Sequence, residues 1–235
     1  MRSLWGLSWR NHVVEKRVEN TEKSSDILCK IMTRWKNELE FEKGKEDFLK
    51  EARSLSRFMK LPSIVSVRDF FQKNHTAYIV MEYVEGTRVR NYIRANGKMP
   101  GDEVFALMEP VIHSLCDIHK TGLIYRDISI DNLMFDDNGQ LKLIDFGAAW
   151  NVELPENTIT VSIKRGFSPE EQYRVKGEQG PWTDLYSLCG TMYFMLTEKI
   201  PEESVERVYA DHLVMLQQME DGRCFSSFAA KKSHR

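Results

Sequence analysis

Several protein classes are excluded by what this sequence lacks. No stretch approaches the eighteen or so consecutive apolar residues that a membrane-spanning helix requires. Cysteines are few, four in 235 residues and far apart, which predicts a reduced protein without structural zinc. An excess of one charge is also missing, since 33 basic residues face 35 acidic ones. We therefore expect a cytoplasmic globular protein with no targeting signal, no nucleic-acid partner and no membrane span.

Glycine is scarce in the first third of the chain. Before Gly86 only Gly6 and Gly44 occur. A loop whose backbone amides approach a phosphate closely depends on glycine, because a side chain would block the approach. The sequence therefore predicts that no glycine-rich phosphate-binding loop precedes Gly86.

The chain does contain clear periodic segments. Phe48, Ala52, Leu55 and Met59 recur at helical spacing and predict an amphipathic helix that ends at Leu61-Pro62. Two apolar runs, 63–71 and 76–84, flank the polar turn 72–75 and predict an antiparallel hairpin.

Further elements are expected after Gly86. The pattern predicts helices around 89–95 and over 101–119, short strands with polar ends between 123 and 150, and a largely buried helix over 183–196 that stops before Pro201. Residues 1–40 carry no sustained period and have no predicted place in the fold. Residues 222–235 are polar and rich in small side chains, which predicts a frayed end.

Polar residues that could carry chemistry gather in one region. Asp127 and Asn132 lie in a polar loop before an apolar strand, and Asp145 follows the next strand. Carboxylate and amide oxygens on short loops suit magnesium that also binds substrate phosphates. A further carboxylate can orient a hydroxyl group, so the arrangement favours phosphoryl transfer.

These residues belong to a set of ordered motifs that resembles the protein kinases. Y-R-D-I-S-I-D-N at 125–132, D-F-G at 145–147 and S-P-E at 168–170 resemble their signature motifs. M-E-Y-V-E-G resembles the hinge, and K-E-A-R-S-L resembles the helix with the ion-pair glutamate, here Glu51. T-D-L-Y-S-L-C-G resembles the helix whose aspartate, here Asp184, braces the catalytic loop. The sequence of these motifs is most similar to that of bacterial serine/threonine kinases, and the resemblance covers residues from about 41 to 201.

The resemblance implies an α+β, protein-kinase-like two-lobed fold. Residues 41–85 would form a partial small lobe without the glycine-rich hairpin. Residues 86–221 would form a mostly helical large lobe without its last helices. On this interpretation the domain is truncated at both ends.

The resemblance also implies roles for individual residues. Asp127 would accept the substrate's hydroxyl proton, and Asn132 with Asp145 would hold Mg2+ on ATP. The residues implied in nucleotide binding are Met81, Glu82 and Val84 of the hinge, Met134, Glu51 and Lys30.

Two of these assignments have alternatives. Lys30 ends I-L-C-K, which resembles the strand that carries the ion-pair lysine; in a second alignment the segment before Phe41 is an insert and the strand lies before Met1. Glu51 lies on the apolar stripe of its helix, but in a lysine-rich helix a glutamate is also typical of a solvated pair.

The loops depart from the kinase pattern at several positions. Tyr125 replaces the usual histidine, and Ser129 replaces the catalytic-loop lysine, for which Lys164 is a candidate substitute. Glu170 is expected to lack its arginine partner, and His119 is expected to be structural. Arg126 beside Asp127 is typical of kinases that a phosphate controls, and the acceptors available for it are Thr158, Thr160 and Ser162.

The function implied is an ATP- and magnesium-dependent kinase that acts on a serine or threonine of a protein substrate. Without the phosphate clamp, weak or absent activity is expected. The alternatives are a pseudokinase-like protein-binding module, a truncated remnant, and a small-molecule phosphotransferase of the aminoglycoside-kinase type. The motifs S-P-E and T-D-L-Y-S-L-C-G speak against the last.

Overall fold

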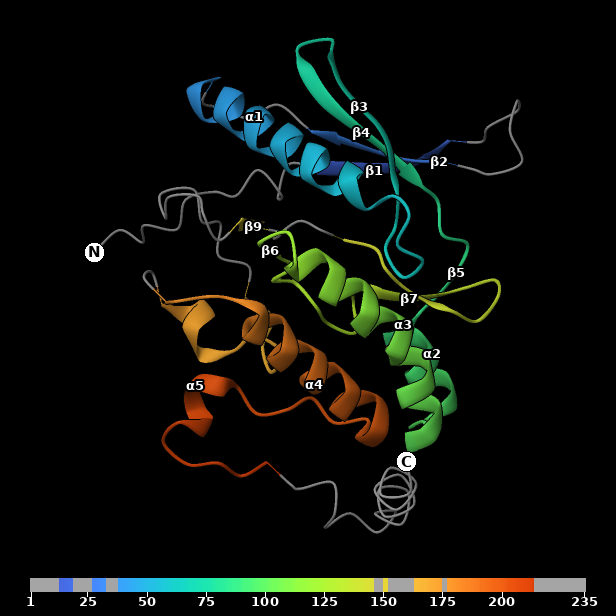
Figure 1. Cartoon of the computed structure of the whole chain (residues 1–235), viewed down its shortest axis with the longest axis vertical. Coiled ribbons are helices and arrows are strands. Elements are labelled where there is room, and N and C mark those ends of the chain that lie inside the picture. Colours follow the sequence, from blue (N-terminus) through green and yellow to red (C-terminus); the bar gives the residue numbers. More distant parts are fainter. Residues whose placement is uncertain are drawn as a thin grey trace. The chain divides into compact units, whose positions relative to one another are not determined.

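The computed structural model describes residues 13–18, 27–32, 38–145, 150–151, 163–174 and 177–213 (Figure 1). The chain divides into two compact units, Met1–Glu85 and Gly86–Arg235. The boundary between the units lies between Glu85 and Gly86.

The first unit is built on a four-stranded antiparallel sheet with the order β1-β2-β4-β3. Its strands are β1 (Val13–Val18), β2 (Ile27–Met32), β3 (Val67–Lys73) and β4 (Thr76–Glu82). Along β4, burial alternates residue by residue, with Ala77, Ile79 and Met81 buried. This period of two places one face of the sheet in the core of the unit.

Helix α1 (Glu38–Leu55) packs against β3 and β4. Phe48, Ala52 and Leu55 are buried, as their helical spacing predicts. The predicted end at Leu61-Pro62 is wrong, because the α-helix ends at Leu55 and tightens into a 3-10 turn, Ser56–Phe58. The tighter turn buries Phe58, and the next amides, of Leu61 and Ile64, bond to carbonyls three residues back.

The hairpin β3–β4 is confirmed, with a shorter turn than predicted. Asn74 and His75 alone connect the strands, with φ of 53° and 57°. Two left-handed residues match the twist of a tight hairpin, and asparagine tolerates this conformation well. Gln72 and Lys73 therefore continue β3.

Residues 1–40, which had no predicted place, supply two strands of this sheet. β2 pairs with β1 on one side and β4 on the other, with Lys30 opposite Ile79. A strand that precedes α1 and lies next to β4 is thus present within the chain.

The second unit combines helices with short strands. The helices are α2 (Val89–Asn96), α3 (Gly101–His119), α4 (Pro181–Thr197), α5 (Ser204–Arg207) and a 3-10 turn, Glu170–Tyr173. The strands β5 (Gly86–Arg88), β7 (Leu133–Asp136) and β8 (Leu141–Leu143) form one sheet, and β6 (Leu123–Ile124) pairs with β9 (Trp150–Asn151).

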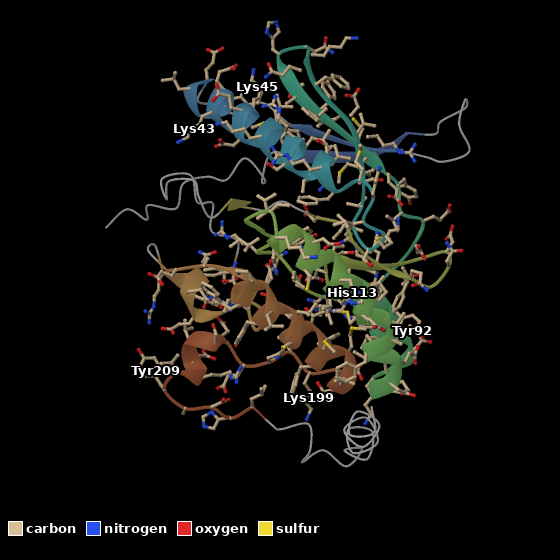
Figure 2. The ribbon with its side chains drawn as sticks, viewed as in Figure 1. Lys43, Lys45, Tyr92, His113, Lys199 and Tyr209 are labelled. Carbon is tan, nitrogen blue, oxygen red and sulfur yellow. The ribbon has the colours of Figure 1, made fainter. Side chains whose placement is uncertain are left out.

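The core of the second unit lies between α3, α4 and the strands, since α3 packs against α4, β6 and β8. The ring centroids of Tyr92 on α2 and Phe135 on β7 lie 4.8 Å apart, and this contact fixes α2 to β7. Figure 2 labels Tyr92 on this helix. In the part of the chain that the structure describes, no helix is long and apolar enough to cross a membrane.

Candidate active site

One buried carboxylate of α4, that of Asp184, holds the loop 125–132 through hydrogen bonds. Asp184 has no exposed surface, and its two oxygens accept the backbone N–H groups of Tyr125 and Arg126, each at 2.7 Å. The predicted brace is therefore confirmed. Arg126 has a left-handed backbone with φ of 67°, a conformation that the two bonds beside it help to hold.

His119 completes this brace from the end of α3. Its Nε2 lies 2.7 Å from an Asp184 carboxylate oxygen, so it donates to the same group that holds the loop. The expectation that His119 is a structural residue agrees with this contact.

Asp127 and Asn132 are held together in the loop and are both buried. The side-chain amide of Asn132 donates through Nδ2 to the backbone carbonyl of Asp127 at 2.8 Å. Because its nitrogen is engaged there, Oδ1 is the remaining polar atom of the Asn132 side chain, and it is an acceptor. This bond holds Asp127 and Asn132 together in a single turn of the loop.

Asp145 belongs to the same region of the second unit. The N–H of Ile144 donates to the backbone carbonyl of Asn132 at 2.9 Å, which places the following residue beside the loop. Burial raises the pKa of Tyr125 well above its ordinary value, and the charges of Asp145, Asp127 and Asp184 raise it further. The neutral phenol of Tyr125 therefore lies among three carboxylates.

Lys164 approaches Asp127 from the segment before the S-P-E motif. Its Nζ lies 3.7 Å from Oδ1 of Asp127. The segment is tied to the loop a second time, since Nε2 of Gln172 donates to the backbone carbonyl of Arg126 at 2.9 Å. The role of Gln172 was missed by sequence reasoning, because nothing in the pattern E-E-Q-Y distinguishes a buried glutamine from an exposed one.

The remaining carboxylate of the loop, Asp131, is paired with arginines. Arg90 binds both of its oxygens, through Nε and through Nη2 at 2.8 Å, and Nη1 of Arg88 donates to its backbone carbonyl at 2.6 Å. The bond from Arg90 holds the pKa of Asp131 below its ordinary value. Sequence reasoning missed this pair too, since the partners lie far apart in the chain.

The donors fit magnesium better than a metal held by protein alone. Among the described residues, no group of three or more His, Cys, Asp and Glu side chains could hold a metal ion. Mg2+ instead takes one or two carboxylates and leaves its other positions to water and phosphate. Oδ1 of Asn132 and the carboxylate of Asp145 would provide a donor set of this kind.

The predicted nucleotide-binding residues are divided between the units. Met81, Val84 and Lys30 are buried in the first unit, and Lys30 shares one face of β2 with buried Met32. Glu82 accepts the hydroxyl of Ser66 at 2.8 Å, which anchors the end of β4. Met134 lies half-buried on β7 in the second unit.

Other predicted residues lie outside the described ones. These are Phe146 of the D-F-G motif, the candidate phosphate acceptors Thr158, Thr160 and Ser162, and the side chain of Glu51 on α1.

The expectation that Glu170 lacks a partner is wrong. Arg174, four residues later on the same turn, binds its carboxylate. The neighbouring Glu171 accepts the hydroxyl of Thr183 at 2.8 Å and so connects this turn to the start of α4.

Comparison with known proteins agrees with this geometry. The model of the protein kinase domain matches residues 13–232. The chain is 33% identical over 171 residues to the serine/threonine-protein kinase PrkC of Bacillus subtilis, covering 71% of this chain and 26% of that protein. It is 33% identical over 164 residues to PknL of Mycobacterium tuberculosis, covering 67% of this chain and 41% of that protein.

A further relative is the probable serine/threonine-protein kinase CPE1738 of Clostridium perfringens, 34% identical over 158 residues, with 66% of this chain and 22% of that protein covered. The chain thus spans less than half the length of these relatives. The match of the domain model over most of the chain, together with the braced loop 125–132, shows that this chain belongs to the protein kinase family, with bacterial serine/threonine kinases among its relatives.

Proposed function

We propose that this chain transfers the γ-phosphoryl group of ATP to a serine or threonine hydroxyl of a protein substrate, with Mg2+ as the cofactor. The observation that carries the proposal is the loop 125–132. Within it a hydrogen bond joins Asn132 to Asp127, and Asp184 accepts the N–H groups of the two preceding residues. Phosphoryl transfer depends mainly on positioning and charge neutralisation, and a buried, braced loop suits both.

Asp127 orients the acceptor and takes its proton. As the hydroxyl oxygen forms a bond to the γ-phosphorus, the bond from that phosphorus to the bridging oxygen breaks, and its electron pair leaves with ADP. The hydroxyl proton moves to the carboxylate of Asp127. Asn132 and Asp145 would hold Mg2+, which supplies positive charge to the phosphate oxygens when it is bound.

Residues of the first unit would bind the rest of the nucleotide. Backbone groups of Glu82 to Val84 would meet the adenine beside Met81. Lys30, buried on the strand before α1, would bind phosphate and pair with Glu51. Because the sequence before Gly86 offers no glycine-rich loop, the expected rate is low.

The test is a phosphotransfer assay with radiolabelled ATP on a general protein substrate. Asp127→Asn keeps the size of the side chain but cannot take a proton, so transfer should fall at least a hundredfold. Asp137→Asn, in the exposed turn after β7, is the matched control and should leave the rate unchanged. Undiminished transfer by purified Asp127→Asn protein would contradict the assigned role.

A second candidate function is a protein-binding module that retains the kinase fold without transfer. The scarcity of glycine before Gly86 favours it, since a weak phosphate clamp lowers catalysis more than it lowers docking. This candidate predicts a protein partner that binds equally well to Asp145→Asn and to the unaltered chain, in the presence or absence of Mg2+.

A further inference from the structure

Lys164 lies beside the carboxylate that we propose as the base. Its Nζ is 3.7 Å from Oδ1 of Asp127, and the Lys164 side chain is 34% exposed while that of Asp127 is 6% exposed. The ammonium group therefore lies at the boundary between the buried loop and solvent, where a substrate can reach it. Both residues belong to the second unit.

The backbone of Lys164 is fixed by a compact turn. Its carbonyl accepts the N–H groups of Phe167 at 2.9 Å and Ser168 at 2.8 Å, and its own N–H donates to the hydroxyl of Ser168 at 3.0 Å. Ser204 anchors this turn, because its hydroxyl group donates to the carbonyl of Ser168 at 2.8 Å. Lys164 is thus presented to Asp127 from a rigid support.

Gly166 makes this turn possible. Its φ is +79°, and a Cβ at this position would lie 2.4 Å from the carbonyl oxygen of Pro201. Any other residue would be strained and would collide with backbone. The position of the Lys164 backbone therefore depends on the conformation of Gly166 and on the hydrogen bonds of the turn.

The part of the loop that follows Asp127 carries no basic residue. Residues 127–132 contain no basic side chain, and Ser129 is fully buried, with a hydroxyl that has no hydrogen-bond partner among the described residues. The other carboxylate of the loop, Asp131, is bound at both oxygens by Arg90. Among the described residues, Lys164 thus brings an ammonium group to 3.7 Å from the carboxylate of Asp127.

We infer that Lys164 is a catalytic residue that binds the transferring phosphoryl group, an inference that rests on the proposed function. In the resting protein its ammonium group pairs with Asp127. When the acceptor hydroxyl donates its hydrogen bond to that carboxylate, the ammonium group turns to the oxygens of the γ-phosphoryl group. It then neutralises the charge that spreads over them while the oxygen–phosphorus bond to ADP breaks and the bond to the acceptor forms.

The variant Lys164→Met removes the charge and keeps the length of the side chain. The matched control is Arg165→Met, which removes a charge from the next residue of the same turn. The side chain of Arg165 is 87% exposed, and its Nε lies 3.4 Å from Oε1 of Glu203. Thermal unfolding of each variant verifies folding, and Lys164→Gln provides a second neutral side chain.

The first readout is binding rather than turnover. Affinity for ADP with Mg2+ is measured with and without aluminium fluoride, which mimics the phosphoryl group in transfer. We expect aluminium fluoride to raise the affinity for ADP with Mg2+ in the unaltered chain and in Arg165→Met. The factor by which it raises this affinity should be at least tenfold smaller in Lys164→Met. The second readout is the rate of transfer, for which Lys164→Met should lower kcat about 10²- to 10³-fold with little change in KM for ATP.

The possible results separate the two proposals. Equal tightening in Lys164→Met and the unaltered chain overturns the role of Lys164 and leaves the proposed function intact. An equal loss in Lys164→Met and Arg165→Met also overturns it, since the effect would then come from the turn. No binding of ADP with Mg2+ by the unaltered chain contradicts the proposed function and, with it, the role of Lys164.

Discussion

At the scale of single residues, the loop is held by contacts whose partners lie far apart in the sequence. Asp184 meets Tyr125 and Arg126, Gln172 meets the carbonyl of Arg126, and Arg90 meets Asp131. The kinase-like motifs predicted the first of these contacts. Neither helical nor strand periodicity carries information on the others, because both describe which face of an element is buried and not which polar groups meet.

The pair Arg90–Asp131 predicts a pH-dependent contribution to stability. The pKa of Asp131 in the folded chain lies below its ordinary value, chiefly because of the bond from Arg90, so the pair stabilises the fold above that ordinary value. The contribution is lost as the pH falls through the lowered pKa. Since Asp131 is partly exposed, Arg90→Ala should lower the free energy of unfolding by about 0.5–1 kcal/mol near pH 7.

Urea unfolding at several pH values measures this difference. The gap between Arg90→Ala and the unaltered chain should shrink below about pH 4, where the carboxyl group takes up a proton. A gap of constant size down to about pH 3 would show that Arg90 acts through packing and not through its charge.

The turn that presents Lys164 predicts an unequal cost for two similar substitutions. Gly166 and Gly139 both have left-handed backbones, with φ of +79° and +72°. A Cβ at Gly139 has no neighbour within 4 Å, whereas one at Gly166 would collide with the carbonyl of Pro201. Gly139→Ala should therefore cost about 1 kcal/mol of unfolding free energy, and Gly166→Ala about 2–4 kcal/mol. Equal costs in urea unfolding would mean that the turn adapts without strain.

At the scale of elements, long helices were predicted well and short or unusual segments were not. α3 and α4 follow their apolar patterns closely, because each buries a continuous stripe. Strand β1 was missed, and β2 was proposed only as one alternative, through the resemblance of I-L-C-K to a kinase strand. Their sequences, V-V-E-K-R-V and I-L-C-K-I-M, are short and show no clean alternation of apolar and polar residues.

The end of α1 also escaped prediction. The apolar spacing continues through Met59, but Met59 is 53% exposed and the α-helix has already tightened at Ser56. The burial of Phe58 decides this end, and it depends on the neighbouring strand rather than on the helical pattern.

The brace between α4 and the loop predicts a strong coupling of stability to one side chain. Asp184→Ala leaves two buried N–H groups, of Tyr125 and Arg126, without their acceptor, so the free energy of unfolding should fall by about 2–5 kcal/mol. Amide hydrogen exchange at these two residues should accelerate. The control is Asp117→Ala on the exposed side of α3, which pairs with Lys120 at the surface and should cost less than about 1 kcal/mol.

If Asp184→Ala and Asp117→Ala unfold at the same urea concentration, the loop is held by its other contacts, such as that of Gln172 with Arg126. Measuring exchange at Arg126 in both variants distinguishes local release of the loop from loss of global stability.

At the scale of the whole molecule, the central proposal is that this member of the protein kinase family binds ATP and Mg2+. The domain model matches residues 13–232, whereas the regions that sequence motifs covered began at about residue 41. The strands β1 and β2 therefore extend the kinase-like part of the chain toward its beginning. Lys30 lies on β2, the strand next to β4, and its role as the ion-pair lysine stays a prediction.

The most direct test is the thermal midpoint of the purified chain with ATP alone, with Mg2+ alone and with both, alongside Asp145→Asn. A ligand that binds only the folded protein raises the midpoint by mass action. We predict a rise with ATP and Mg2+ together that is lost in Asp145→Asn, while the two proteins melt alike without ligand. A cooperative transition that ATP and Mg2+ do not shift in the unaltered chain would contradict the claim that this site binds nucleotide.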